Sequence, residues 1–96
     1  MGCVYIIRNI SNGKVYVGKT MHPLDFRWNQ HLSHAKYIDS DDVIHKAIRK
    51  YGVDWFICTS VFESDDENEI NKMEIKLIHA FDTYHNGYNR TCGGEG

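Results

Sequence analysis

Apolar and polar residues alternate at the start of the chain, as they do in half-buried strands. Residues 3–8 and 15–17 are rich in β-branched and aromatic side chains, and an Asn-Gly pair between them predicts a hairpin turn. Each predicted strand carries a tyrosine, Tyr5 or Tyr16, that points to the opposite face from its two neighbours. An opposite or diagonal register would place both phenols on one face. The sequence leaves that register open, and tyrosine is also simply a good strand residue.

A helical repeat follows at residues 23–37, with Pro23 as a favourable first residue. Its apolar stripe consists of Leu24, Trp28, Leu32 and Ala35. Arg27 and His31, four residues apart, stack at the edge of that stripe. A polar head at such an edge can reach a cleft while its stem packs. The alternatives are a surface arginine with a packed stem and an ordinary helix histidine.

Acidic residues at positions 39–42 predict the N-terminus of a second helix that ends near Tyr51, before Gly52. Four apolar positions face inward: Ile44, Ala47, Ile48 and Tyr51. Four polar positions are expected to face outward as the main basic patch: His45, Lys46, Arg49 and Lys50. This patch is either a phosphate-binding surface or a solvated helix face.

Residues 55–63 have the composition of a third strand, and the Ser-Asp-Asp-Glu run at 64–67 predicts a third helix that runs to about Phe81. Its apolar arc contains Ile70, Met73, Leu77, Ile78 and Phe81. Glu74 falls inside this arc. A buried carboxylate is costly unless it is paired, protonated or bound to a metal. Glu74 is therefore a candidate metal ligand, or else the partner of an Arg or Lys in the core.

The last residues combine a turn with a glycine-rich end. Asn86 and Gly87 form the turn, after which Tyr88 can return to the sheet and bring Asn89 beside it. Residues 92–96 have almost no side chains that could join a core, so they predict the start of a flexible linker.

Length and composition are those of one globular domain. The chain has 96 residues, 42% of them hydrophobic, and a net charge of −2. A tight, free-standing nucleic-acid binder would usually be basic, so DNA contact would need a local patch or another domain. Cys3, Cys58 and Cys92 are widely spaced, which argues against a disulfide framework or a zinc site and for a reducing compartment. No apolar run is long enough for a membrane span.

The order of the singled-out residues resembles the GIY-YIG nuclease family. Cys3-Val4-Tyr5 stands where the family has Gly-Ile-Tyr, and Tyr16-Val17-Gly18 where it has Tyr-Ile-Gly. Arg27 with His31, Lys50-Tyr51-Gly52, Glu74 and Gly87-Tyr88-Asn89 follow in the family's order. The departures are Cys3 for glycine and Val4 for isoleucine, and both suit a strand.

This resemblance implies an α+β fold, a three-stranded antiparallel sheet flanked by helices in ββααβα order. It also implies that residues 1–91 are a catalytic domain and that residues 92–96 begin a Gly-rich linker to a C-terminal DNA-binding region. Such a junction is found in phage and intron-encoded homing members. The expected function is metal-dependent hydrolysis of DNA phosphodiester bonds.

The resemblance also implies a set of catalytic residues: Tyr5, Tyr16, Arg27, His31, Glu74 and Asn89. Glu74 would hold one divalent ion, Mg²⁺ or Mn²⁺, and Arg27 would clamp the phosphate. Either tyrosine could position or deprotonate the water, with His31 as a proton relay. The expected substrate-binding residues are Lys14, Gly18, Lys19, Lys46, Arg49 and Lys50, and Lys14 or Lys19 could also lower the pKa of a phenol.

The expected partner is double-stranded DNA, with no membrane and no small-molecule cofactor. The isolated domain is expected to be monomeric and to work in the reducing cytoplasm of a bacterial or phage-infected cell. Two alternatives remain open: a non-catalytic nucleic-acid-binding domain of the same fold, and a repair or junction-resolving nuclease.

Overall fold

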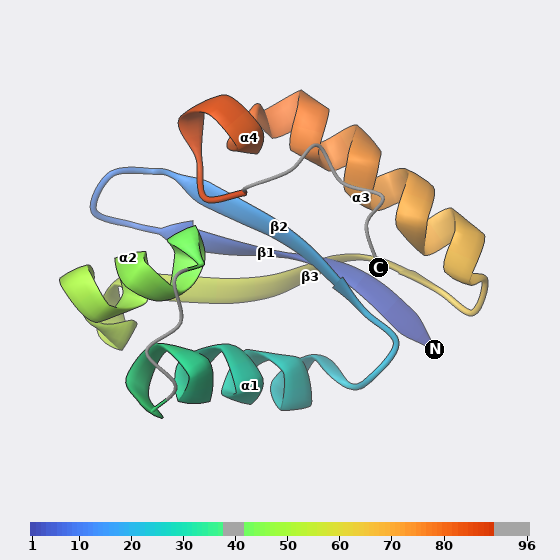
Figure 1. The fold of residues 1–96 in the computed structure, drawn as a ribbon. Coiled ribbons are helices and arrows are strands. Elements are labelled where there is room, and N and C mark those ends of the chain that lie inside the picture. The colour runs from blue at the N-terminus through green and yellow to red at the C-terminus, as the bar shows by residue number, and fades with distance from the viewer. Residues whose placement is uncertain (38–41, 90–96) are drawn as a thin grey trace.

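The structure, a computed structural model, describes residues 1–37 and 42–89 and has a three-stranded antiparallel sheet at its centre (Figure 1). The strand β1 (Gly2–Asn9) is the middle strand, and β2 (Val15–Thr20) and β3 (Phe56–Ser64) are its neighbours. The sheet predicted from the sequence is therefore confirmed, and β2 is an edge strand.

Helices cover both faces of this sheet (Figure 1). The helices α1 (Leu24–Tyr37) and α2 (Val43–Tyr51) pack on one face, and α3 (Glu67–Phe81) packs on the other. This is the expected ββααβα order. Two short elements were not expected, the 3₁₀ turn η1 (Val53–Trp55) and the single-turn helix α4 (Thr83–Asn86).

Strand alternation divides the interior into two apolar cores. Tyr5 and Ile7 of β1 face α1 and α2, where they meet a core that includes Ala35, Ile44 and Ile48. The other face of the sheet meets α3 through a smaller core made of Val4, Val15, Val17, Ile70 and Ile78. The hairpin therefore serves both cores at once.

The pairing of β1 with β2 determines the relative position of the two tyrosines. Tyr5 lies opposite Gly18, and Ile7 lies opposite Tyr16. Tyr5 and Tyr16 are thus diagonal neighbours on one face of the sheet, which is the arrangement that places two phenols side by side. Their ring centroids are 6.3 Å apart.

Two aromatic residues differ from what the sequence pattern predicted, one in its element and the other in its burial. Trp55 was expected in the third strand, but it belongs to η1 and is 49% exposed. Phe81 was expected on the apolar arc of α3, but it is 43% exposed. The buried positions of α3 are Ile70, Glu74 and Ile78, a row of residues four apart, and Phe81 in the last turn lies off that row.

The final described residues return to the edge of the sheet, as the sequence predicted. The Tyr88 backbone N–H donates to the Val15 carbonyl at 3.0 Å. The Asn89 side chain donates to the Val17 carbonyl at 2.8 Å and accepts from the Val17 N–H at 2.9 Å. These bonds satisfy backbone groups on the outer side of the edge strand, which would otherwise be unpaired.

The predicted linker, residues 92–96, lies outside the described residues. Within residues 1–37 and 42–89, no helix is long and apolar enough to cross a membrane.

The Tyr88 hydroxyl joins the end of the chain to the hairpin turn, and this contact can be tested. It accepts from the side-chain amides of Asn9 at 3.1 Å and Asn12 at 3.2 Å, and Asn9 is fully buried. We expect Tyr88→Phe to lower the free energy of unfolding by about 1–3 kcal/mol, because a buried amide loses its partner. Urea denaturation would measure this, with exposed Tyr84→Phe as the control. Equal stability of the two variants would contradict it.

Candidate active site

Three aromatic side chains from three elements meet on the α1 face of the sheet. The ring centroid of His31 lies 5.9 Å from that of Tyr5 and 5.4 Å from that of Tyr16, and both contacts are edge-on. Tyr5 and His31 are buried and Tyr16 is partly buried. Three residues that the sequence singled out separately are therefore brought together.

A short hydrogen bond joins Tyr5 to His31. The Tyr5 hydroxyl lies 2.7 Å from His31 Nε2. Burial, followed by the charges of Arg27 and the neighbouring histidines, lowers the pKa of His31 to about 3. Burial, followed by the neighbouring Tyr16, raises the pKa of Tyr5 well above its usual value. Both groups are thus neutral at pH 7, and a neutral imidazole nitrogen can accept a hydrogen bond from the phenol.

Arg27 supplies positive charge beside the phenols. It lies on α1 one turn before His31, is partly buried, and donates to the Gln30 side chain at 3.1 Å. Burial raises the pKa of Tyr16, and the guanidinium of Arg27 opposes this effect there and at Tyr5. A cation at this position favours any negative charge that develops near the two rings.

Glu74 is buried on α3, as the helical pattern predicted, and is 8% exposed. Its Oε1 lies 3.7 Å from Lys19 Nζ, which also donates to the Asn71 side chain at 2.6 Å. Lys19 is therefore a basic partner of this carboxylate, as in the alternative that the sequence left open. Lys19 and Tyr16 lie on opposite faces of β2, so the edge strand separates Glu74 from the phenols. The charge of Glu74 nevertheless contributes, after burial, to the raised pKa of Tyr16.

The donor atoms near Glu74 suit a hard cation better than a soft one. A carboxylate is the ligand type that Mg²⁺ prefers, and Mg²⁺ usually keeps several water ligands. Within residues 1–37 and 42–89 there is no group of three or more His, Cys, Asp or Glu residues that could hold a metal ion. The described residues thus fit a single ion held by one carboxylate, rather than a zinc centre.

Gly18 creates the space in which the phenols meet. A Cβ atom at this position would collide with the end of the Tyr5 ring and would lie 2.8 Å from Cε2 of Tyr16. The structure places Gly18 directly beneath the two rings. Its role as a substrate contact stays a prediction.

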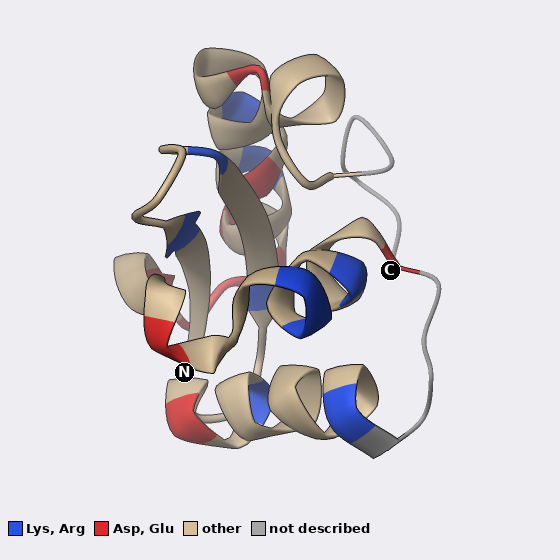
Figure 2. Cartoon of the chain, turned by 90° about the vertical axis from the view of Figure 1, so that its left-hand side faces the viewer, with Lys and Arg blue, Asp and Glu red and all other residues tan. Residues whose placement is uncertain are grey.

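The predicted phosphate-binding residues are dispersed over the surface. Lys14, Lys46 and Lys50 are exposed, and α2 carries much of the positive charge (Figure 2). Arg49 donates to the Ala35 carbonyl at 3.1 Å and so braces the end of α1. These residues remain predicted DNA contacts, and they do not line the ring cluster.

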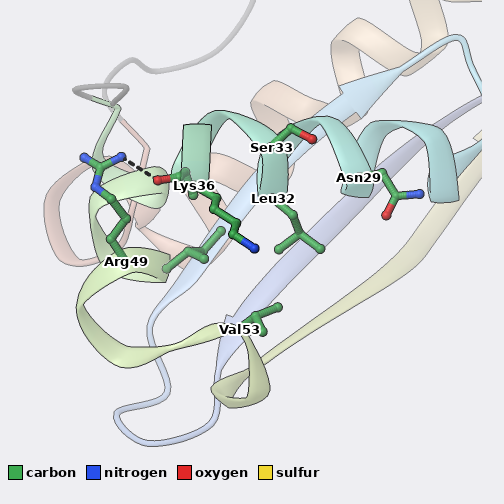
Figure 3. A pocket seen from close by; sticks show the side chains of 8 residues that line it. Asn29, Leu32, Ser33, Lys36, Arg49 and Val53 are labelled. Atoms are coloured by element: carbon green, nitrogen blue, oxygen red, sulfur yellow. Dashed lines mark hydrogen bonds between the residues drawn. The ribbon is translucent and has the colours of Figure 1, made fainter. Parts of the chain in front are cut away.

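A separate apolar cavity of about 560 Å³ lies between α1 and α2 (Figure 3). Leu32 and Val53 line it, and Lys36 and Arg49 contribute basic side chains to its wall. It contains none of the predicted catalytic residues, so the cavity is not the candidate site of chemistry.

The outward orientation expected for His45 is wrong. His45 is 2% exposed, and its Nε2 lies 2.8 Å from Nδ1 of His31. A neutral imidazole can be buried when its ring nitrogens have hydrogen-bonding partners, and burial lowers the pKa of His45. The sequence signal was available: His45 lies beside Ile44 and Ile48, at the edge of the inward arc of α2.

The candidate site therefore combines paired tyrosines on a sheet, a helix arginine beside them and a buried glutamate across the edge strand. The GIY-YIG catalytic domain family matches residues 1–89. The chain belongs to this family, as its motifs indicated.

Known relatives agree with this assignment. The chain is 33% identical over 94 residues to a protein of Enterobacteria phage T4 named "Putative endonuclease segD". The match covers 97% of this chain and 39% of that protein, so the chain spans about two fifths of the relative's length. A mutant of the catalytic domain of the intron endonuclease I-TevI superposes with a TM-score of 0.86 at 25% identity, over 100% of both chains. A second structure, of the catalytic domain of the homing endonuclease I-TevI, gives 0.83 at 25% identity over 95% of this chain and 99% of that one.

The packing role of Gly18 can be tested by adding one methyl group. We expect Gly18→Ala to lower the free energy of unfolding by about 1–3 kcal/mol, because the new Cβ must displace the Tyr5 ring. Gly2→Ala is the matched control on β1, since its Cβ would mainly meet the flexible end of exposed Met21. Urea denaturation compares the two variants, and an equally small loss in both would refute the packing role.

Because His31 is buried in its neutral form, we expect the free energy of unfolding to depend on pH. An unfolded histidine has a pKa of about 6.5, whereas that of folded His31 is lowered to about 3. Between these values the unfolded chain binds more protons, so the free energy of unfolding falls as pH falls below about 6.5. For one proton the loss approaches about 1.4 kcal/mol per pH unit.

We expect His31→Gln to flatten this dependence, measured by urea denaturation between neutral pH and about pH 4.5. His79→Gln removes an exposed histidine from α3 and is the control. The same slope in His31→Gln and the wild type would show that His31 is not the responsible group.

Proposed function

We propose that the chain is the catalytic domain of a DNA endonuclease that hydrolyses phosphodiester bonds with one divalent ion, Mg²⁺ or Mn²⁺. One observation carries this proposal. A buried carboxylate, Glu74, lies across one edge strand from a buried phenol–imidazole pair, with the Arg27 guanidinium beside the rings. Phosphodiester hydrolysis needs charge neutralisation and proton transfer at one place, and these groups can supply both.

Each side chain receives a distinct task in this proposal. Arg27 holds the phosphate oxygens as negative charge builds on them. Tyr5 has His31 as its proton acceptor, and Tyr16 is the more exposed of the two phenols. We therefore assign proton transfer to Tyr5 with His31, and contact with the attacking water or the phosphate to Tyr16.

Glu74 would hold the divalent ion, and a bound ion supplies charge neutralisation at the phosphate and the leaving oxygen. Lys19 lies beside the same carboxylate and compensates its charge. The bond from phosphorus to the leaving oxygen breaks as the new bond to water forms, and the water proton passes to the phenol–imidazole pair.

Asn89 contacts the backbone of the edge strand rather than the reacting groups. Its side-chain amide forms hydrogen bonds with the N–H and the carbonyl of Val17, which lies between Tyr16 and Gly18. We assign it the task of holding the β2 backbone, and with it the Tyr16 ring, in position.

The proposed substrate is duplex DNA, and the proposed setting is a homing-type nuclease of which this chain is the cutting part. Support comes from the likeness to the I-TevI catalytic domain and from the greater length of the phage relative. With a net charge of −2, the chain should hold DNA weakly by itself, as an isolated monomer. Cys3 and Cys58 are free thiols, which suits the reducing cytoplasm of a bacterial or phage-infected cell.

The metal assignment can be tested by one isosteric substitution. We expect Glu74→Gln to abolish Mg²⁺-dependent nicking of plasmid DNA, because an amide has nearly the same shape but poor affinity for a hard cation. Circular dichroism should show that the variant stays folded. Glu69→Gln, at an exposed position of the same helix, is the control and should cut normally.

Cleavage by Glu74→Gln at the wild-type rate would refute the metal assignment. Absence of nicking by the wild type in Mg²⁺ or Mn²⁺ would instead favour a non-catalytic nucleic-acid-binding domain. In that case the pair of Lys19 with Glu74 would be purely structural.

A further inference from the structure

A row of polar contacts continues from the candidate site into the α1–α2 interface. Tyr5 bonds His31 through Nε2, and Nδ1 of His31 lies 2.8 Å from Nε2 of His45. On the far side, Nδ1 of His45 lies 3.5 Å from a carboxylate oxygen of Asp42. Both histidines are almost fully buried, whereas Asp42 is half-exposed at the start of α2. The row therefore runs from the ring cluster toward solvent.

The charge of Asp42 favours one direction for the hydrogen bonds of the row. An ionised carboxylate can only accept, so at 3.5 Å, beyond ordinary hydrogen-bond length, it favours the His45 tautomer with its hydrogen on Nδ1. In a neutral imidazole the other nitrogen is then an acceptor, so Nε2 of His45 accepts from Nδ1–H of His31. Nε2 of His31 is left with a free lone pair. Tyr5 must therefore donate to it.

We propose that Asp42 and His45 are positioning residues that hold His31 in the Nδ1–H tautomer and so make its Nε2 the proton acceptor for Tyr5. This inference rests on the proposed nuclease function for its catalytic meaning, but the tautomer itself does not depend on activity. The opposite tautomer of His31 would present an N–H to the phenol oxygen, and Tyr5 could then no longer transfer its proton to the imidazole.

The proposed transfer conserves atoms and charge. The O–H bond of Tyr5 breaks, its proton forms a bond to Nε2 of His31, and a phenolate and an imidazolium result. The imidazolium keeps its Nδ1–H bond to His45, whose own Nδ1–H faces the Asp42 carboxylate. A negative charge at the end of the row stabilises the positive charge that appears on His31. The phenolate then takes the proton of the attacking water, and the imidazolium gives the proton it received to the leaving oxygen, so both side chains return to the neutral state.

Several charged and titratable groups face the two imidazoles and determine their resting state. Within residues 1–37 and 42–89 these groups are Tyr5, Tyr16, Arg27, His34, Asp42 and Arg49. Burial and the nearby positive charges lower the pKa of both histidines, while Asp42 opposes this effect at His45. Both histidines of the row are therefore neutral at rest, and each has one protonated nitrogen and one nitrogen that accepts a hydrogen bond.

Three variants distinguish the orientation of His31 by hydrogen bonds from simple packing against its ring. In His45→Gln the side-chain amide oxygen can still accept from His31 Nδ1–H, whereas His45→Leu offers no acceptor. Asp42→Asn keeps a good N-cap residue, but its amide can donate to His45 and reverse the row. His79→Gln changes an exposed histidine on α3, outside the row, and serves as the control.

We expect His45→Leu to lower the single-turnover rate of DNA cleavage about 10- to 100-fold, by analogy with the loss of the orienting partner of a metal-bound histidine. The same substitution should also shift the limb of the pH–rate profile that reports the titration of the Tyr5–His31 pair. His45→Gln should keep most of the rate, and His79→Gln should match the wild type. Equal rates and pH profiles for His45→Leu and His79→Gln would overturn the proposal.

The tautomer can be read without any activity, by two-bond ¹⁵N–¹H correlation spectra of histidine-labelled protein. We expect His31 to carry its hydrogen on Nδ1 in the wild type and in His45→Gln, and on Nε2 in Asp42→Asn. A wild-type His31 with its hydrogen on Nε2 would refute the proposal. If the wild type fails to cut DNA, the proposed function fails, but these spectra still decide the tautomer. If His45→Leu does not fold, the other two variants provide the test.

Discussion

The pairing of Tyr5 with Gly18 across the first hairpin is the constraint on which the candidate site depends. Because glycine has no side chain, the Tyr5 ring can lie over the backbone of the edge strand and meet Tyr16 from the next position on that face. The helix α1 then brings His31 and Arg27 to the same place. A one-residue shift of register would send Tyr16 into the α3 core and leave Tyr5 without its neighbour.

Much of this arrangement could be predicted from local patterns. Strand alternation and the turn signal predicted the hairpin, and helical periodicity placed Glu74 on a buried face, which the structure confirms. The order of motifs indicated the family and its strand topology. These features succeeded because each depends on short-range geometry, in which spacing along the chain determines which face a side chain occupies.

What could not be predicted depends on how separate elements meet. His45 lies at the margin of the apolar arc of α2, so its burial depends on a partner that α1 happens to supply. Lys19 is one of several nearby cations, and only the packing of α3 against the hairpin makes it the partner of Glu74. Phe81 has the right helical angle for burial but lies in the last turn, off the buried row. Periodicity describes one element at a time, and such contacts belong to pairs of elements.

The division of the site between the two faces of the sheet determines when the site can form during synthesis of the chain. The phenols belong to one core, Glu74 to the other, and Tyr88 and Asn89 secure the outer side of the edge strand that lies between them. A nascent chain on the ribosome has the hairpin and α1 long before it has α3. The proposed site is therefore complete only when nearly all of these residues have been synthesised, and a shorter fragment would lack Glu74 or the residues that secure the edge strand.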